Sequence, residues 1–285
     1  MRVHPIFDER TNTLTYVVSD EATKDAVIID PVLDFDPAGG KLWTESLDKT
    51  AQLVTEHGLK VHYVLETHAH ADHLSGSQWL KSRFGAKVAI SRRITEVQEV
   101  FRDVFNLGQD FPVDGRQFDE LLTDGQVVKA GSLSVKALAT PGHTPACMSY
   151  FVGDAVFTGD ALFLNDVGVG RCDFPKGDPA ALYDSVTSKI WTLPDATRLF
   201  TGHDYPPQGR TWQASTTVGE SKKKNVQLNT AMTKAQFVEK RTARDRTLAP
   251  PRLLLPSIQV NIDAGKLPPA ESNGTRYLKI PLKGL

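Results

Sequence analysis

The chain has few of the features that would place it in a specialised class of proteins. Its two cysteines, Cys147 and Cys172, are too few for a disulfide framework and fit a reducing compartment. The 33 basic residues balance 34 acidic ones, so no net field attracts nucleic acid or an anionic membrane. No run of 18 apolar residues occurs, and the N-terminus resembles neither a signal peptide nor a transit peptide. We therefore expect a soluble cytoplasmic protein that contacts neither nucleic acid nor membrane.

The densest group of chemically active side chains lies between Thr67 and His73. Three histidines and one aspartate fall within these seven residues, and alanine fills each gap between the ligands: His68, His70, Asp72 and His73. Imidazole and carboxylate groups bind first-row transition metals well, and alanine adds no bulk that would keep them apart. Since the chain has only eight histidines, a surface loop that is histidine-rich by chance is the less favoured explanation. The pattern predicts a metal site.

The local pattern places this cluster on a turn between a strand and a helix. An apolar run at 61–65 predicts a short buried strand before it, and 79–84 has helical character after it. Such turns are where α/β proteins bind their ligands.

Apolar periodicity predicts the remaining elements. Period-two or short apolar runs predict strands at 13–18, 26–29, 88–90, 127–128, 133–138, 148–152 and 155–157, the last two forming a hairpin. A spacing of three to four predicts helices at 43–57, 94–104 and 178–191, with a loop at 108–115.

Four more ligand-type residues stand at the ends of predicted strands: Asp30, His143, Asp160 and His203. The last three each follow a glycine, which lets the backbone turn and leaves room beside a metal. Each signal is weak alone, and Asp30 before Pro31 is equally explained as a turn aspartate. Together with residues 67–73 they favour one metal site built from several strand ends.

This combination resembles the metallo-β-lactamase superfamily. The resemblance implies an α/β fold, the four-layer αββα sandwich, with two metal positions at one edge of its sheets. It would assign His68, His70 and His143 to the first position and Asp72, His73 and His203 to the second, with Asp160 bridging. Asp30 then matches an aspartate that supports the ligands from the end of an early strand.

Five segments resemble the persulfide dioxygenases, the relatives of the mitochondrial protein of ethylmalonic encephalopathy. They are 26–32, 67–73, 141–145, 170–174 and 203–205. The resemblance implies one non-haem Fe(II) per chain, held by His68, His143 and Asp160. Two histidines and one carboxylate leave coordination positions open, which suits an iron oxygenase. His70, Asp72, His73, His203 and Asp30 are then supporting or second-metal candidates.

That family oxidises glutathione persulfide with O2 to sulfite and glutathione, in sulfide detoxification. By resemblance, Arg171 would meet a glutathione carboxylate, for which a bidentate guanidinium is well suited. Tyr205 would lie beside the bound substrate and oxygen, so both residues are catalytic or substrate-binding candidates. A homodimer is one possible assembly.

Two other functions remain open. A dinuclear Zn(II) hydrolase resembling glyoxalase II would use a metal-bound hydroxide to attack a thioester, and all seven ligand residues for it are present. A non-enzymatic sulfur sensor is less favoured, because a site without catalysis would tolerate loss of ligands. The wider match around Arg171 and the N-terminal strands favours the dioxygenase.

The chain departs from the animal persulfide dioxygenases in several places. The stretch from Ser91 to Gly125 is longer, the loop from Asp160 to Arg171 has extra residues, and the tail is longer and basic. This favours a bacterial branch of the family. Cys172 replaces a threonine, and a buried, inert side chain is favoured over a redox role.

We expect residues 1–215 to form the catalytic core and 216–285 an extension packed on it. The extension is too apolar for a disordered linker. Its basic run from Lys222 to Arg246 has acidic and apolar residues interleaved, which favours a solvated helical face over a nucleic-acid patch.

Overall fold

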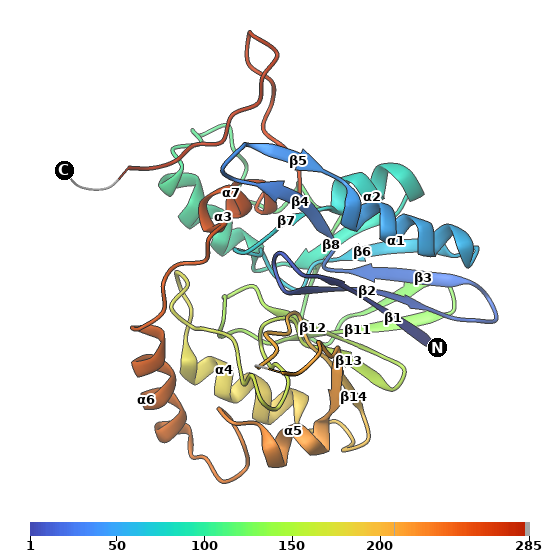
Figure 1. The fold of residues 1–285 in the computed structure, drawn as a ribbon, viewed down its shortest axis with the longest axis vertical. Coiled ribbons are helices and arrows are strands. Elements are labelled where there is room, and N and C mark those ends of the chain that lie inside the picture. Colours follow the sequence, from blue (N-terminus) through green and yellow to red (C-terminus); the bar gives the residue numbers. More distant parts are fainter. Residues whose placement is uncertain (208, 283–285) are drawn as a thin grey trace.

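The computed structural model describes residues 1–207 and 209–282, in which helices enclose two large sheets (Figure 1). The first sheet has the order β1-β2-β3-β6-β8-β9, formed by Arg2–Asp8, Thr13–Ser19, Asp25–Ile29, Lys60–Leu65, Lys87–Ser91 and Glu120–Leu122. The second runs in chain order from β10 to β15, formed by Val127–Ala130, Leu133–Ala139, Met148–Val152, Ala155–Phe157, Arg198–Phe200 and Ser215–Thr217. A small sheet, β5-β4-β7, consists of Lys41–Trp43, Val32–Asp36 and Leu74–Ser75.

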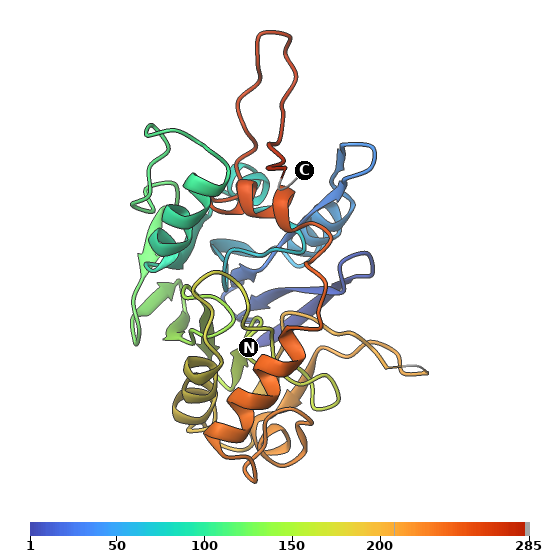
Figure 2. The ribbon, with the colours of Figure 1, turned by 90° about the vertical axis from the view of Figure 1, so that its left-hand side faces the viewer.

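The helices divide between the two outer faces (Figures 1 and 2). The first sheet is covered by α1, α2, α3 and α7, which are Glu45–Glu56, Ser77–Phe84, Ile94–Val104 and Leu254–Asn261. The second sheet is covered by α4, a π-helical turn, α5 and α6, which are Pro179–Ser185, Val186–Ile190, Val218–Lys224 and Lys234–Asp245. None of the described helices is long and apolar enough to cross a membrane.

Three apolar clusters separate these layers, which confirms the expected αββα sandwich. Strand β2 contributes side chains to two of these clusters, one on each of its faces. Leu14, Tyr16 and Val18 face the second sheet, whereas Val17 between them faces the helices. This period-two alternation follows from strand geometry, and both faces are apolar because both are covered. A third cluster lies between the second sheet and α4, α5 and α6.

Most predicted elements are present, with one correction and several omissions. The helix expected over 178–191 is α-helical only to Ser185 and continues as a π-helical turn. Strands β1, β4, β5, β7, β9 and β15 and helix α7 were not predicted. The predicted boundary between 215 and 216 falls inside β15, which spans Ser215–Thr217. The division of the chain into core and extension at this boundary stays a prediction.

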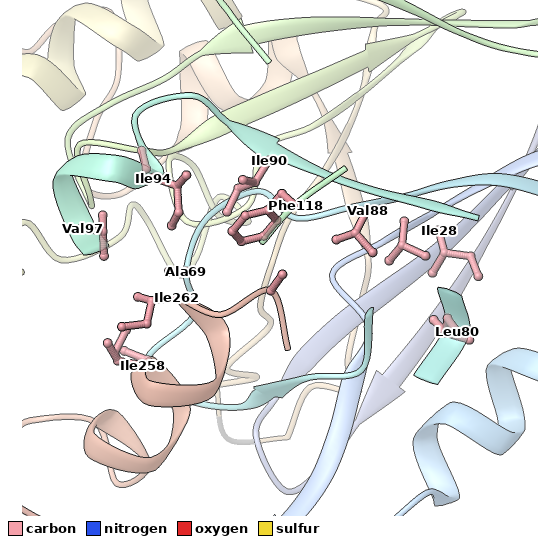
Figure 3. Close-up of a cluster of buried hydrophobic side chains, with 14 of the residues drawn as sticks. Ile28, Ala69, Leu80, Val88, Ile90, Ile94, Val97, Phe118, Ile258 and Ile262 are labelled. Carbon is pink, nitrogen blue, oxygen red and sulfur yellow. The ribbon is translucent and has the colours of Figure 1, made fainter. Parts of the chain in front are cut away.

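Helix α7 joins the C-terminal extension to the layer beside the metal-site turn. Figure 3 shows Ile258 from α7 and Ile262, the residue just after it, beside Ala69, which lies between His68 and His70. All three side chains are buried in the same cluster as Ile90 and Phe118. The segment after α7 projects from the body as a long loop (Figures 1 and 2).

Candidate metal centre

The ligand-type residues meet at one edge of the two sheets. The cluster His68–His73 follows β6, and His143 follows β11. Asp160 and His203 follow the neighbouring strands β13 and β14, which are parallel and so end on the same side. The fold therefore brings together residues that are up to 135 positions apart in the sequence (68 to 203).

One group consists of His68, His143 and Asp160, whose ligand atoms all lie within 4.8 Å of one another. Asp160 Oδ2 is 3.6 Å from His143 Nε2 and 4.0 Å from His68 Nε2. Ligands about 2.1 Å from one metal, at angles of 90–120°, lie roughly 3.0–3.6 Å apart. The spacing is thus close to that of a coordinated ion.

A second group consists of His70, Asp72 and His203. His203 Nε2 lies 3.3 Å from Asp72 Oδ2 and 3.4 Å from Asp160 Oδ1. The Asp160 carboxylate therefore directs one oxygen to each group, which is the position of a bridging ligand. His73 Nδ1 lies 3.4 Å from Asp72 Oδ2 at the side of this group.

The polar atoms that face this space are unsatisfied within the described chain. His68 Nε2, His73 Nε2, His203 Nε2 and Asp160 Oδ1 are buried without a hydrogen-bond partner among the described residues. Buried polar atoms are almost always paired, so a cluster of unpaired ones indicates a missing partner. Nitrogen and carboxylate donors at this spacing fit a transition metal ion. Burial and the neighbouring imidazoles lower the pKa of His68 well below its ordinary value, so its ring is neutral and able to coordinate.

The sequence analysis did not identify Glu66, which is buried beside His70. His70 Nε2 lies 3.0 Å from Asp30 Oδ1 and 3.5 Å from Glu66 Oε2. Burial alone would lower the pKa of His70, but these two carboxylates raise it well above its ordinary value. Ser75 and Ser77 donate their hydroxyls to Glu66. Glu66, at the start of the ligand turn, is thus hydrogen-bonded to Ser75 and Ser77 at its end.

Asp30 supports the start of the same turn. Its carboxylate accepts hydrogen bonds from Thr67 N at 2.7 Å and from Thr67 Oγ1 at 2.8 Å. The residue is buried and has a φ of +51°, which is strained for a non-glycine residue. A turn aspartate before Pro31 would not need this burial, so the geometry favours the supporting role over the turn role.

Two glycines give the close approach that ligand residues need here. A Cβ on Gly202 would stand 2.8 Å from Asp160 Oδ1, and one on Gly159 would stand 2.5 Å from Thr67 Oγ1. Any larger residue would push the ligand loops apart. The glycines before Asp160 and His203 therefore have the spatial role that the sequence predicted.

The orientation of His143 comes from its other ring nitrogen. His143 Nδ1 donates to the carbonyl oxygen of Arg171 at 2.6 Å, which directs Nε2 toward Asp160. The loop that carries this carbonyl is held by α6, because Asp245 accepts from Cys172 N at 2.9 Å. Asp245 is itself paired with the buried Arg241 at 2.6 Å.

A residue in the C-terminal extension, Asn261, holds the ligand turn directly. Its amide nitrogen donates to the carbonyl oxygens of His70 and His73, both at 2.8 Å, and its oxygen accepts from Ser75 N at 2.7 Å. No local signal in the sequence identifies Asn261, because its partners lie more than 180 residues away.

A cavity of about 770 Å³ opens above the metal centre, with His143, Asp160 and Asp72 in its wall. Five arginines line it: Arg10, Arg171, Arg241, Arg244 and Arg252. Arg171 donates from Nε and Nη2 to the Asp173 carboxylate, both at 2.6 Å, and from Nη1 to Ala249 O at 2.8 Å. One N–H on each terminal nitrogen is left for another partner. Four of the five arginines pair with carboxylates, so the free N–H groups of Arg171, together with Arg244, are what this wall offers an anionic molecule.

Tyr205 also lines this cavity, and 46% of its surface is exposed. Its ring stacks on that of His203, with centroids 5.5 Å apart. Desolvation by the surrounding cavity wall, together with the Asp72 and Asp160 carboxylates, raises the Tyr205 pKa, so the hydroxyl remains a donor at neutral pH.

Several relatives have full-length or near full-length similarity to the chain. It is 48% identical over 295 residues to a probable metallo-hydrolase of Burkholderia pseudomallei (strain 1710b), with all of both chains covered. It is 45% identical over 287 residues to the protein named glyoxylase B2 of Dictyostelium discoideum, covering 100% of this chain and 97% of the relative.

The chain is also similar to persulfide dioxygenases, and a sequence pattern of one protein family covers all of its ligand-type residues. The mitochondrial persulfide dioxygenase ETHE1 of Homo sapiens is 36% identical over 203 residues, covering 70% of this chain and 67% of the relative. The crystal structure of ETHE1 from Myxococcus xanthus has a TM-score of 0.75 at 34% identity, covering 93% of this chain and 100% of that one. The metallo-beta-lactamase superfamily pattern matches residues 9–203, from the turn after β1 to the last ligand-type histidine. The chain thus belongs to the metallo-beta-lactamase superfamily of metal-binding enzymes.

Proposed function

We propose that the protein is a persulfide dioxygenase that binds one Fe(II) through His68, His143 and Asp160 and oxidises glutathione persulfide to sulfite. The observation that carries this proposal is the compact group formed by these three side chains, two of which, His143 and Asp160, line an arginine-lined cavity. Two histidines and one carboxylate are the ligand set of non-haem Fe(II) oxygenases. The similarity to ETHE1 over 70% of the chain supports the same assignment.

Bound in this triad, Fe(II) would supply the redox chemistry that O2 and a sulfur substrate need, with coordination positions left open for both. The chain contributes position and charge. Asp160 Oδ2 and the unpaired Nε2 of the neutral His68 ring would face the ion. The contact between His143 Nδ1 and the Arg171 carbonyl holds the third ligand in the tautomer that coordinates.

The cavity wall would bind the glutathionyl group. Its carboxylates are anionic, and a guanidinium holds a carboxylate through two parallel hydrogen bonds. Arg171 has two N–H groups to offer beside its bonds to Asp173 and Ala249. Arg244, from α6, lines the same wall and forms no ion pair within the described residues. Tyr205, which lines the cavity and stacks on the His203 ring, would donate its hydroxyl to the substrate.

A dinuclear zinc thioester hydrolase is the second candidate. The bridging position of Asp160 and the second ligand group support it, because a hydrolase of this kind needs two adjacent ions. The name glyoxylase B2 of the Dictyostelium relative also points in this direction. If the site holds a single ion, the second group of His70, Asp72 and His203 would instead keep the ligand turn and the Asp160 carboxylate in place.

The experiment that separates the two candidates measures what the enzyme consumes. An oxygen electrode follows O2 uptake with glutathione persulfide while a thioester assay follows lactoylglutathione. We expect persulfide-dependent O2 uptake that stops under argon, with glutathione alone inactive because it lacks the outer sulfur. Rapid hydrolysis of lactoylglutathione without persulfide-dependent O2 uptake would instead establish the zinc hydrolase.

A further inference from the structure

A second cavity, of about 960 Å³, adjoins the metal centre. Ala71 from the ligand turn, His143 and Arg171 line both this cavity and the arginine-lined one. The segment from Leu248 to Arg252, between α6 and α7, also contributes to both walls. Two compartments therefore meet at the same metal ligand, and either could direct a bound molecule to it.

The second compartment differs from the first in its chemistry. Away from the shared residues its wall is mostly apolar, with Phe101, Val104, Leu254, Leu255, Tyr277 and Ile280 among its members. Four charged side chains also line it: Arg171 and Asp173, which pair with each other, Arg252, which pairs with Asp36, and Arg276, which donates to the Pro268 carbonyl oxygen. Against the apolar part of this wall, an ionised group would lose its hydration without gaining a hydrogen-bond partner. An apolar group would remove both itself and this wall from water.

Exposed apolar side chains gather at this compartment. In the described part of the chain, eleven large apolar side chains are exposed, and five of them line it: Leu42, Val104, Leu248, Tyr277 and Ile280. They come from β5, α3, the segment between α6 and α7, and the loop that projects after α7 (Figure 1). Contiguous exposed apolar surface of this kind marks a binding site. Its volume lies within the range of small-molecule pockets.

We propose that this compartment binds the organic group of an apolar sulfur substrate, an alkyl or acyl chain whose terminal sulfur reaches the metal centre beside His143. The inference rests on the proposed function and extends its substrate class from glutathione persulfide to apolar hydropersulfides. One hydropersulfide, one O2 and one water then give one thiol, one sulfite and two protons. The S–S bond breaks, three S–O bonds form at the outer sulfur, and its four electrons go to O2.

The test uses variants that alter only the apolar compartment. Val104→Lys and Ile280→Asp place charges in its wall at positions that are already 37% and 66% exposed, so folding is retained. Neither residue lines the arginine-lined cavity. Val127→Lys, at a 50% exposed valine on β10 outside both cavities, is the matched control.

Two measurements are made on each full-length variant: calorimetric binding of octanethiol, and kcat/KM for octyl hydropersulfide and for glutathione persulfide. We expect octanethiol to bind the wild type and the control equally, and Val104→Lys and Ile280→Asp to lose about tenfold in affinity. The kcat/KM for octyl hydropersulfide should fall by the same factor, with that for glutathione persulfide unchanged.

Two results would overturn the inference while leaving the proposed function intact. One is turnover of glutathione persulfide without any octanethiol binding. The other is a dimer of the wild type that Val104→Lys and Ile280→Asp dissociate, with octanethiol binding unaltered, since a second copy would then occupy the surface. Octanethiol binding that depends on Val104, in a protein that turns over no persulfide, would support the compartment and contradict the proposed function.

Discussion

The side-chain amide of Asn261 donates to the carbonyl oxygen of His73 at 2.8 Å, across a separation of 188 residues. It also contacts the backbone of His70 and Ser75, so one side chain satisfies three polar groups of the ligand turn. Asn261 is the last residue of α7, and Ile258 of this helix and Ile262 just after it pack beside Ala69 of that turn (Figure 3). The C-terminal extension is thereby part of the support of the metal centre.

We predict that Asn261→Ala weakens metal binding by about ten- to a hundredfold, because partners that orient a ligand turn typically have effects of this size. The matched control is Gln259→Ala on the same helix. Gln259 also forms three hydrogen bonds through its amide, but with Leu255 and Lys279. Both variants should lose stability, and only Asn261→Ala should lose metal affinity in a competition with a chelator. Equal metal affinity in the two variants would show that Asn261 is merely structural.

The ligand groups predict different effects of removing Asp160, His143 or Asp72. His143→Ala, Asp160→Ala and likewise His68→Ala should abolish iron retention, because each removes one of three ligands. Asp72→Ala should keep about one iron per chain, since in a mononuclear site Asp72 only supports His203. Elemental analysis of the purified variants is the measurement, with the exposed His57→Ala as control. If Asp72→Ala empties the site as fully as His143→Ala does, the mononuclear assignment fails.

Arg171→Ala should raise the KM for glutathione persulfide about ten- to a hundredfold at unchanged iron content, because a hydrogen bond to a charged group contributes about 1.5–3 kcal/mol. Asp173→Ala removes the bidentate partner of Arg171 but leaves the guanidinium in the cavity wall. It should therefore change KM much less. A fall in melting temperature of the same size in both variants, with KM unaltered, would mean that Arg171 serves only the ion pair.

Both cysteines should resist alkylation in the folded protein. Cys147 and Cys172 are 3% and 5% exposed, and burial raises the pKa of both thiols, that of Cys147 to about 12. At pH 8 a thiol with that pKa is ionised in only about one molecule in ten thousand, and the thiolate is the reactive form. Mass spectrometry after iodoacetamide should find label only when urea is present. Labelling of native Cys172 would restore a redox role for that residue.

The sandwich and the ligand edge could be predicted from short-range patterns because those patterns are physical constraints. The hairpin of β12 and β13 has the bounds 148–152 and 155–157 that its alternation and the Gly153-Asp154 turn indicate. The glycines before Asp160 and His203 are required by close approach, which is visible in the sequence as a repeated pairing.

The elements and site residues that the sequence analysis missed have unusual local sequences or depend on contacts formed only in the folded chain. Strand β1 contains Pro5, which the edge of a sheet tolerates although its pattern argues against a strand. Helix α7 contains Pro256, which is accommodated in the first turn, where no helical donor is lost. Asn261 acts through partners more than 180 residues away, and Glu66 acts through Ser75 and Ser77, which the conformation of the ligand turn brings back beside it.

The most direct test of the proposed function is a titration of the metal-free protein with Fe(II) under anaerobic conditions, followed by O2 uptake and sulfite release with glutathione persulfide. One ion held by His68, His143 and Asp160 predicts that activity rises linearly and saturates at about one iron per chain, with O2 and sulfite in equal amounts. Activity that appears only with two zinc ions per chain, as thioester hydrolysis without O2 consumption, would contradict it.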